Sequence, residues 1–370
     1  VTRHESEALA SMGHECVVLD RSVLGGGPEP WGADAAAVKK LETLGDFDLA
    51  HFYAGTFGDT AHRLKSRGCR ISWTIAAHSV AVSKREHEKL GIGFPYEHLT
   101  SPELWRRYIE GYRLADVIVC PGSVPAQTVR EYGGEFAIKR IEIIPHGCDL
   151  PTEKCQVCDG LGDTTWPSED GGSPLLICDK CSGRGSITTP PTSLPDRFVV
   201  GYLGSCGAPD KGVRYLMEAW KRLNYADALL ILAGRDSTSP WVRQMWQQFG
   251  GGNVHFAGWQ EDVSSFYDSI SLYIQPSASE GFGIEVVESL AAGRPVLCSR
   301  GAGACDVVAP TMTFPACDAD ALADAIHNAR AGWHPDQEQC LRAAAKYTWG
   351  KVRQQYVDLW QSLLNQEKNQ

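Results

Sequence analysis

Short apolar segments alternate with amphipathic segments along the first part of the chain. Strands are predicted where an apolar run ends near Gly, Pro or another small residue, at "CVVLD", "FDLAHFYAG", "RISWTIAAHS", "DVIVCPG" and "IEIIPHG". Helices are predicted at "RHESEALASMGHE" and at "SPELWRRYIEGYRLA", which begins with a Ser-Pro capping pattern. Apolar strands that alternate with helices predict a parallel sheet covered on both faces.

The same alternation restarts near residue 195. Strands are predicted at "RFVVGYLGS", "ALLILAGR", "VHFAGW", "SLYIQPS" and "PVLCSRG", and helices at "GVRYLMEAWKRL", "GIEVVESLAAG", "ADALADAIHNARAG" and "WGKVRQQYVDLWQSLL". The pattern therefore predicts an α/β protein with two Rossmann-like, doubly wound domains. We assign the N-terminal domain to residues 1–150 and the C-terminal domain to residues 195–350, and the helix at 351–370 is a candidate to pack back on the first domain.

The segment at 151–194 has a different composition, rich in Gly, Ser, Thr, Pro and Cys. It is predicted to be an insertion between the two domains. Two copies of Cys-x-x-Cys-x-Gly-x-Gly lie in it, and 19 residues separate the two cysteine pairs. Four thiolates at this spacing predict one tetrahedral, structural zinc ion, with the ligands Cys155, Cys158, Cys178 and Cys181.

The motif is similar to the cysteine-rich region of J-domain chaperones, whose repeats bind zinc. Four thiolates leave no open coordination position, so a catalytic zinc is disfavoured. The alternative is a pair of redox dithiols. A zinc knuckle could stiffen the hinge, form a homodimer contact or bind a protein partner.

Composition restricts the class of protein. The net charge of -10 disfavours nucleic-acid binding, which needs a basic surface. No apolar run reaches the roughly 18–20 residues that span a bilayer. The 13 cysteines are odd in number and mostly scattered, which predicts a reducing cytoplasmic location and buried thiols at Cys16, Cys120 and Cys298. Basic and aromatic residues at 80–109 leave open a peripheral membrane surface or a solvated helix face.

The segment "PSASEGFGIEVVESLAAGRPV" is the most informative about function. A predicted strand ends, a glycine-containing loop follows, and a helix starts near Gly283. Ligands bind beyond the carboxyl ends of parallel strands, and a helix N-terminus favours an anion. Gly281 and Gly283 allow the backbone to approach a phosphate, and Glu280 and Glu288 can accept hydrogen bonds from sugar hydroxyls.

This segment resembles the Glu-x7-Glu motif of retaining glycosyltransferases of family 4, which have the GT-B fold. The segments "IIPHGCD", "VVGYLGSCGAPDKGVRYLMEAWKRL", "VHFAGW" and "YTWGKV" resemble further motifs of that family in the same order. The resemblance extends over nearly the whole chain except the cysteine-rich insertion.

The resemblance implies roles for individual residues. Glu280 would lie near the transferred sugar, and His78 would contact the sugar or orient the acceptor. Glu288 would bind the ribose, and Lys211 the diphosphate. The implied donor-binding set is Lys211, Gly204, Arg235, Gly281, Phe282, Gly283, Ile284 and Glu288.

Several of these residues have a structural alternative. Lys211 could be a solvated turn residue and His78 a buried core histidine. His146 and the tryptophans Trp105, Trp220, Trp349 and Trp360 are interpreted as packing residues.

The family's second phosphate-binding cation, an arginine, is absent. Ser205 or Cys206 stands at its position, and Arg235 and Arg294 are candidate substitutes. No catalytic divalent metal is expected, since the string from Asp318 to Asp320 is predicted to cap a helix. The expected reaction moves a sugar from a nucleotide-diphosphate sugar to a hydroxyl of an unknown acceptor, a glycan, lipid or protein, with retention of configuration.

Two alternatives stay open: a catalytically weak scaffold whose zinc module binds a partner, and a nucleotide-sugar epimerase or phosphorylase. Family members begin with a strand and a glycine-rich loop before the first helix, whereas this sequence begins at the helix. We therefore expect residues before Val1 to be missing from this sequence.

Overall fold

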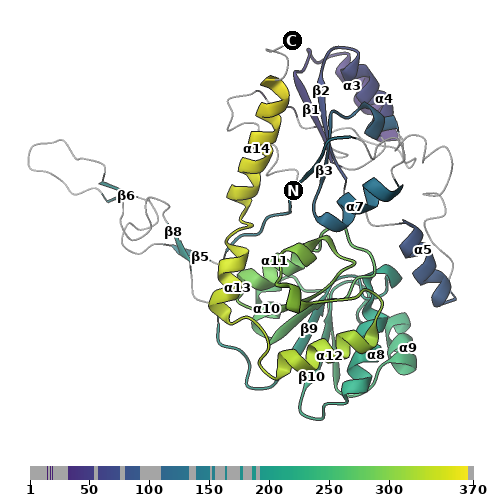
Figure 1. The fold of residues 1–370 in the computed structure, drawn as a ribbon, viewed down its shortest axis with the longest axis vertical. Coiled ribbons are helices and arrows are strands. Elements are labelled where there is room, and N and C mark those ends of the chain that lie inside the picture. The colour runs from purple at the N-terminus through teal and green to yellow at the C-terminus, as the bar shows by residue number, and fades with distance from the viewer. Residues whose placement is uncertain are drawn as a thin grey trace, which may run out of the picture.

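The computed structural model describes residues 15, 17, 19, 32–53, 57–75, 80–91, 110–132, 139–150, 152–154, 163–164, 176–177, 186–188 and 192–365. The elements predicted at 3–20, most of the helix predicted at 101–115, and the side chains of Cys16 and Trp105 lie outside the described residues. Two α/β bodies lie one above the other in Figure 1, and the predicted α/β fold with parallel sheets is confirmed.

The N-terminal body contains a four-stranded parallel sheet in the order β1-β2-β3-β4. The strands are β1 (Leu49–Tyr53), β2 (Arg70–Thr74), β3 (Val117–Cys120) and β4 (Ile141–Ile143). The described helices before residue 150 are α3 (Gly32–Leu41), α4 (Gly58–Lys65), α5 (Val80–Lys89) and α7 (Ser123–Tyr132). Alternate residues of β3 face opposite sides: Ile118 and Cys120 pack with α3, α4 and α7, whereas Val117 and Val119 face the other side.

The C-terminal body contains a six-stranded parallel sheet in the order β11-β10-β9-β12-β13-β14. Its strands are β9 (Val199–Leu203), β10 (Leu229–Ala233), β11 (Val254–Gly258), β12 (Leu272–Gln275), β13 (Val296–Ser299) and β14 (Thr313–Phe314). Most of its strand residues are buried, since helices cover both faces.

Helices α8 (Val213–Leu223), α9 (Pro240–Phe249) and α12 (Ala319–Arg330) cover one face of this sheet. Helices α10 (Val263–Asp268), α11 (Ile284–Ala291) and α13 (Gln337–Ala344) cover the other. Short 3-10 helices η3 (Pro209–Lys211), η4 (Gly303–Asp306) and η5 (Pro310–Met312) lie in the loops. Cys120, Cys298, Trp220, Trp349 and Trp360 are buried, which confirms their interpretation as packing residues.

The chain crosses between the two bodies twice, and the two crossings lie side by side. Cys148 pairs with Thr348 in a parallel bridge, and the Cys148 N–H donates to the Tyr347 carbonyl at 2.9 Å. A Cβ at Gly147 would lie 2.7 Å from the Trp349 ring, so this close approach requires glycine. After the second crossing, α14 (Trp349–Asn365) packs on the free face of the N-terminal sheet, where Tyr356 and Trp360 contact it (Figure 1).

The insertion forms strands of its own, which extend away from both bodies in Figure 1. The strands are β5 (Thr152–Lys154), β6 (Asp163–Thr164), β7 (Leu176–Ile177) and β8 (Ser186–Thr188). β5 pairs with β8 and β6 with β7, in two antiparallel ladders. We call residues 152–188 the arm. The residues that flank the arm contact the C-terminal body: Leu150 packs against its core, and the Thr192 carbonyl accepts a hydrogen bond from Arg294.

Candidate functional site

The strand order of the C-terminal sheet defines where a ligand can bind. From β9 the chain proceeds to β10 and β11 on one side, whereas β12, β13 and β14 lie on the other. β9 and β12 are therefore the two strands at the topological switch point, and a crevice is expected beyond their carboxyl ends. The loop after β9 contains Gly204 and η3, and the loop after β12 contains Glu280 and Gly283.

These two loops are bonded to each other through their backbones. The Asp210 carbonyl accepts hydrogen bonds from the Ala278 N–H at 2.8 Å and the Ser279 N–H at 3.3 Å. Gly212 has a φ of 67°, and a Cβ there would lie 2.0 Å from the Pro276 carbonyl oxygen. Only glycine fits at this close approach, which positions the preceding Lys211 over the second loop.

Lys211 and Glu280 form an ion pair at the switch point, between Nζ and Oε2. The side chains are 29% and 18% exposed, so ligand atoms can reach both. Burial alone would lower the pKa of the Lys211 ammonium, but the charge and hydrogen bond of Glu280 outweigh it and the pKa is raised. Lys211 is therefore a fixed cation that faces a carboxylate.

Helix α11 begins at this loop. Gly283 precedes it with a φ of 93°, and a Cβ there would lie 2.5 Å from the Gln275 side chain. Two hydrogen bonds from η4 fix the loop between β12 and α11: the Gly303 N–H donates to the Glu280 carbonyl, and the Ala304 N–H donates to the Phe282 carbonyl. The N–H groups at the start of α11 are the kind that bind a phosphate.

Glu288 lies one turn further along α11, and its Oε2 accepts a hydrogen bond of 2.9 Å from the Tyr267 hydroxyl. Burial raises the pKa of the Glu288 carboxyl, and the Tyr267 hydrogen bond acts against that rise. Burial also raises the pKa of Glu285, in the first turn of α11, to about 7. The site thus contains three carboxyl groups and one lysine.

Of the two candidate substitutes for a second phosphate-binding cation, Arg235 and Arg294, the structure does not support Arg294. Arg294 has a fully buried side chain that donates to the Tyr267 carbonyl at 2.8 Å and the Thr192 carbonyl at 3.2 Å, so it cannot reach a diphosphate. Cys206, at the position of the family's arginine, is buried, and burial raises the pKa of its thiol to about 12, so this position supplies a neutral group. Arg235 is exposed just beyond the carboxyl end of β10 and can still reach a ligand.

Contacts between described residues join the N-terminal body to the surroundings of this site. The His146 ring packs edge-on against Phe282 with 5.2 Å between the ring centroids. The Ser123 N–H and hydroxyl each donate to Asp306 at 2.7 Å. On α5, Glu86 accepts from the Tyr215 hydroxyl at 2.6 Å. His146 therefore packs against the loop between β12 and α11, which the sequence pattern did not reveal.

His78 and the four cysteines of the predicted zinc site lie outside the described residues. Among the residues that the structure describes, no group of three or more His, Cys, Asp or Glu side chains could hold a metal ion. No helix in the described part of the chain is long and apolar enough to cross a membrane. Asp318 caps α12 by accepting from the Ala321 N–H at 2.9 Å, which confirms its predicted role.

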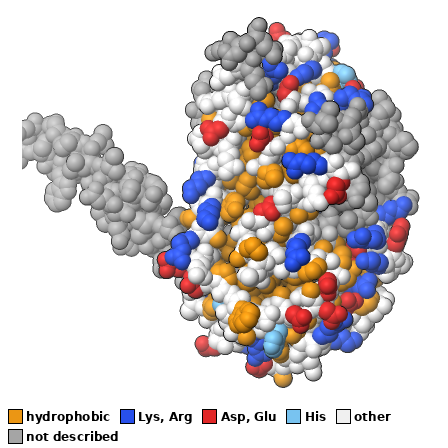
Figure 2. All heavy atoms as spheres, viewed as in Figure 1, with side chains coloured by type: hydrophobic (Ala, Val, Ile, Leu, Met, Phe, Trp, Pro, Cys, Tyr) orange, Lys and Arg blue, Asp and Glu red, His pale blue; other side chains and the backbone are white. Residues whose placement is uncertain are grey.

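Figure 2 shows charged side chains of both signs across the face drawn, with hydrophobic side chains along its middle over both bodies. Sequence reasoning missed Tyr267, Glu285 and Asp306. Tyr267 and Asp306 are adjacent to their partners only in space, whereas Glu285 lies inside the Glu280–Glu288 motif and could have been found there.

Comparison with known proteins finds similarity to glycosyltransferases, chiefly in the C-terminal body. Residues 197–330 match the model of the glycosyl transferases group 1 family. The lipopolysaccharide core biosynthesis glycosyltransferase LpsE of Rhizobium meliloti is 26% identical over 203 residues, which cover 51% of this chain and 56% of LpsE. The capsular polysaccharide biosynthesis glycosyltransferase CapM of Staphylococcus aureus is 31% identical over 31% of each chain. The matched region thus spans about a third to a half of these relatives.

Solved structures resemble the whole chain. A sucrose-phosphate synthase from Thermosynechococcus elongatus superposes with a TM-score of 0.65 at 18% identity, over 98% of this chain and 92% of its own. HepE of Anabaena, solved with UDP and glucose, gives a TM-score of 0.59 at 18% identity, over 89% of this chain and 81% of its own. The fold is therefore the two-body α/β fold of these glycosyltransferases, GT-B, and residues 197–330 match the glycosyl transferases group 1 family within it.

Proposed function

We propose that this protein is a retaining glycosyltransferase of the family 4 type, which transfers a sugar from a nucleotide-diphosphate sugar to an acceptor hydroxyl. The observation that carries the proposal is the Lys211–Glu280 ion pair beside the N-terminus of α11, inside a group 1 domain. A cation and free N–H groups suit a diphosphate, and a carboxylate suits sugar hydroxyls.

The ion pair explains how the site can accommodate a donor. Without ligand, Lys211 and Glu280 neutralise each other. A bound diphosphate would replace Glu280 as the anionic partner of the Lys211 ammonium. The Glu280 carboxylate would then be free to accept hydrogen bonds from the sugar. Lys211 and the α11 N–H groups would then stabilise the departing diphosphate by fixed electrostatics, without a divalent metal.

Retention follows in this proposal from attack on the face of the sugar that the diphosphate leaves. The bond from the anomeric carbon to the phosphate oxygen breaks, and its electron pair goes to the diphosphate. The acceptor oxygen bonds to the same carbon, and its proton passes to the departing phosphate oxygen. Glu280 is paired with Lys211, which favours a role in binding over a role as covalent nucleophile.

The sugar donor can be tested directly. HepE was solved with UDP and with glucose, so UDP-glucose is the first donor to test, followed by GDP-, ADP- and dTDP-sugars. We expect Lys211→Ala to lower kcat/KM for the donor by about 100-fold, the size of effect seen when one transition-state-stabilising group is removed. Glu280→Ala is expected to lower kcat by a similar factor. Donor consumption, followed by release of the nucleoside diphosphate, measures both.

A matched control is Lys221→Ala, since Lys221 is an exposed lysine of α8. This variant should keep the wild-type rate. A Glu280→Ala enzyme with full transfer activity would refute the site assignment. A wild-type protein that binds no nucleoside diphosphate at all would favour the scaffold reading over an enzyme.

We also propose that the arm binds one structural zinc ion. The two ladders are in register at Lys154–Ser186 and at Asp163–Ile177. Eight residues separate the ladders on each side, 155–162 and 178–185, and these are the two Cys-x-x-Cys-x-Gly-x-Gly repeats. The pairing of the flanking strands therefore supports a shared site for the two cysteine pairs.

Metal analysis of the purified protein tests this proposal. One zinc per chain is expected, and Cys158→Ser should lose it and unfold the arm, because metal binding supplies the stability of such a segment. Cys120→Ser, at a buried cysteine of β3, should retain the metal. A metal-free wild-type protein whose cysteine pairs form reversible disulfides would support the redox alternative instead.

A further inference from the structure

We propose that Tyr267 is a positioning residue, which orients the Glu288 carboxylate so that it receives the two ribose hydroxyls of a nucleotide donor. The inference rests on the proposed function above, because it requires a nucleoside diphosphate at the switch point. It adds a residue from a different helix, α10, to the site on α11.

The contact itself is specific. The Tyr267 hydroxyl lies 2.9 Å from Oε2 of Glu288 and 3.4 Å from the Glu285 carbonyl oxygen, so it contacts α11 at two positions about one turn apart. A phenol has one proton to donate, and the shorter distance assigns it to Glu288. The other oxygen, Oε1, accepts no hydrogen bond from the residues described in the structure. A carboxylate held by one oxygen keeps the other oriented toward a ligand.

Tyr267 is itself fixed in place. It is 2% exposed, and its ring packs edge-on against Phe266 and Tyr273 with centroids 5.4 and 6.1 Å apart. Two neighbours along α10 and β12 thus prevent rotation of the ring. A rigid aromatic donor loses little conformational entropy when it holds a partner.

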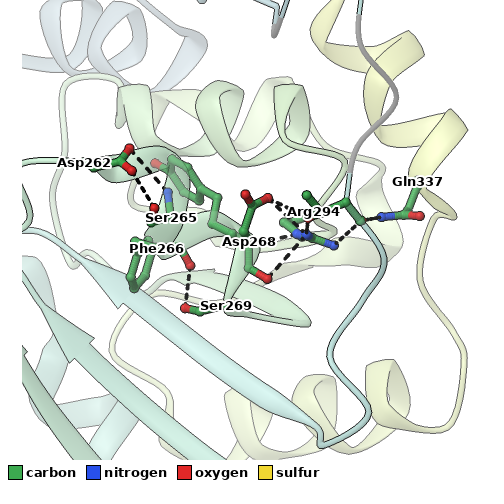
Figure 3. Close-up of polar contacts among 9 residues, drawn as sticks. Asp262, Ser265, Phe266, Asp268, Ser269, Arg294 and Gln337 are labelled. Atoms are coloured by element: carbon green, nitrogen blue, oxygen red, sulfur yellow. Dashed lines mark hydrogen bonds and ion pairs between the residues drawn. The ribbon is translucent and has the colours of Figure 1, made fainter.

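The backbone of Tyr267 is held by the buried Arg294. The Arg294 Nε donates to the Tyr267 carbonyl at 2.8 Å, and Nη2 contacts the Asp268 side chain at 3.4 Å. Figure 3 shows the guanidinium beside Asp268. Gln337 of α13 donates to the Thr192 carbonyl, which also accepts from Arg294. At the other end of α10, Asp262 caps the helix by accepting from the Ser264 and Ser265 N–H groups, and Figure 3 shows Asp262 beside Ser265. Both ends of the short helix are therefore anchored.

Electrostatics give the hydroxyl a second role. Burial raises the pKa of Tyr267 well above its usual value, so the phenol remains a neutral donor at physiological pH. Burial also raises the pKa of Glu288, and the Tyr267 hydrogen bond opposes this. Loss of the hydroxyl should therefore make Glu288 harder to ionise and also leave it free to rotate.

The test separates ribose recognition from general damage. Binding of UDP, and of UDP lacking the 2′ and 3′ hydroxyls, is measured by calorimetry for the wild type and for Tyr267→Phe; GDP and ADP with their dideoxy forms replace UDP if they bind more tightly. The wild type should prefer the ribose form. We expect Tyr267→Phe to reduce that preference about tenfold, the range for a hydrogen bond to a charged group, with the affinity for the dideoxy form within about twofold of wild type.

Two further variants complete the design. Tyr225→Phe removes a hydroxyl that bonds to His327, away from Glu288, and should leave the preference unchanged. In a Glu288→Gln background, Tyr267→Phe should cause no further loss of preference, since the carboxylate that it orients is gone. When UDP affinity is measured as a function of pH, the loss of affinity on the acidic side should begin at a higher pH in Tyr267→Phe, because Glu288 loses a hydrogen bond that lowers its pKa.

The possible failures are distinct. If the wild type prefers ribose but Tyr267→Phe keeps that preference, or weakens both ligands equally, Tyr267 does not position Glu288 and only this inference is overturned. If the wild type binds both forms equally, the ribose role of Glu288 is overturned with it. If it binds no nucleoside diphosphate, the proposed function itself fails.

Discussion

Burial raises the pKa of the Glu285 carboxyl from 4.5 to about 7, and the Glu280 carboxylate adds to the rise while Lys211 acts against it. A carboxyl group with a raised pKa is neutral over part of the physiological range. Next to the proposed phosphate site this matters, because a neutral Glu285 adds no negative charge where the proposal places an anion. The protonation state of this residue therefore links pH to both stability and ligand binding.

The Glu285 prediction concerns stability. Between pH 4.5 and 7 the folded protein holds a proton on Glu285 that the unfolded chain releases, so this residue's contribution to stability is fully present below about pH 4.5 and is lost as pH rises to 7. The loss is at most about 3 kcal/mol. Glu285→Gln should flatten the pH dependence of the free energy of unfolding in this window, measured by urea denaturation at pH 5 and pH 7.5.

A comparison of wild type and variant at each pH removes the contribution of all other titrating groups. Exposed Glu338→Gln, on α13, serves as the control and should leave the pH dependence unchanged. Identical slopes for wild type and Glu285→Gln would show that Glu285 titrates normally in the folded protein.

At the level of elements, α10 is the shortest of the α-helices described in the C-terminal body, yet it carries Tyr267. A helix of six residues has few internal hydrogen bonds and depends on its ends. Asp262 caps its first turn, and Arg294 binds the carbonyl of Tyr267 near its last. The cap should therefore affect the site as well as stability.

We expect Asp262→Ala to lower the melting temperature by a few degrees, as the loss of an N-cap does, and to weaken nucleoside diphosphate binding about threefold through Tyr267. Asp318→Ala removes the corresponding cap of α12, which packs on the opposite face of the sheet. This control should lower the melting temperature to a similar extent without any change in binding. Equal binding by both variants would mean that α10 does not transmit its position to the site.

For the whole molecule, the two bodies meet at paired crossings and at a few side-chain contacts. Asp306 of the C-terminal body accepts two hydrogen bonds from Ser123, the first residue of α7. A carboxylate at a helix N-terminus is favourable. Because these groups belong to different bodies, the contact must break if the bodies separate and can contribute to a closed arrangement that excludes water during transfer.

Asp306→Ala should therefore lower kcat about threefold and leave the affinity for the nucleoside diphosphate unchanged, since the donor loops lie within one body. Steady-state rates and calorimetry measure the two quantities. Asp324→Ala, at an exposed acid of α12, is the matched control and should alter neither. A change in nucleotide affinity without a change in kcat would contradict a role in closure.

The sequence by itself determined the parts that depend on near neighbours. Apolar runs and helical periodicity predicted two parallel α/β bodies, and the glycine loop before α11 indicated the end of the second body where we propose that a phosphate binds. The Asp318 cap and the buried Cys120 and Cys298 also followed from local pattern. Periodicity and capping act over a few residues, so a single sequence contains the information for them.

Only the tertiary structure decided which side chains meet. Lys211 and Glu280 are 69 positions apart, and Ser123 and Asp306 are 183 apart. The sequence suggested Arg294 as a candidate to bind the diphosphate, but its side chain is buried against Thr192. Tyr267 contacts Glu288 from another helix. Such pairs depend on how helices pack across a sheet, and that packing is set by the shape of the whole core rather than by the residues adjacent in sequence.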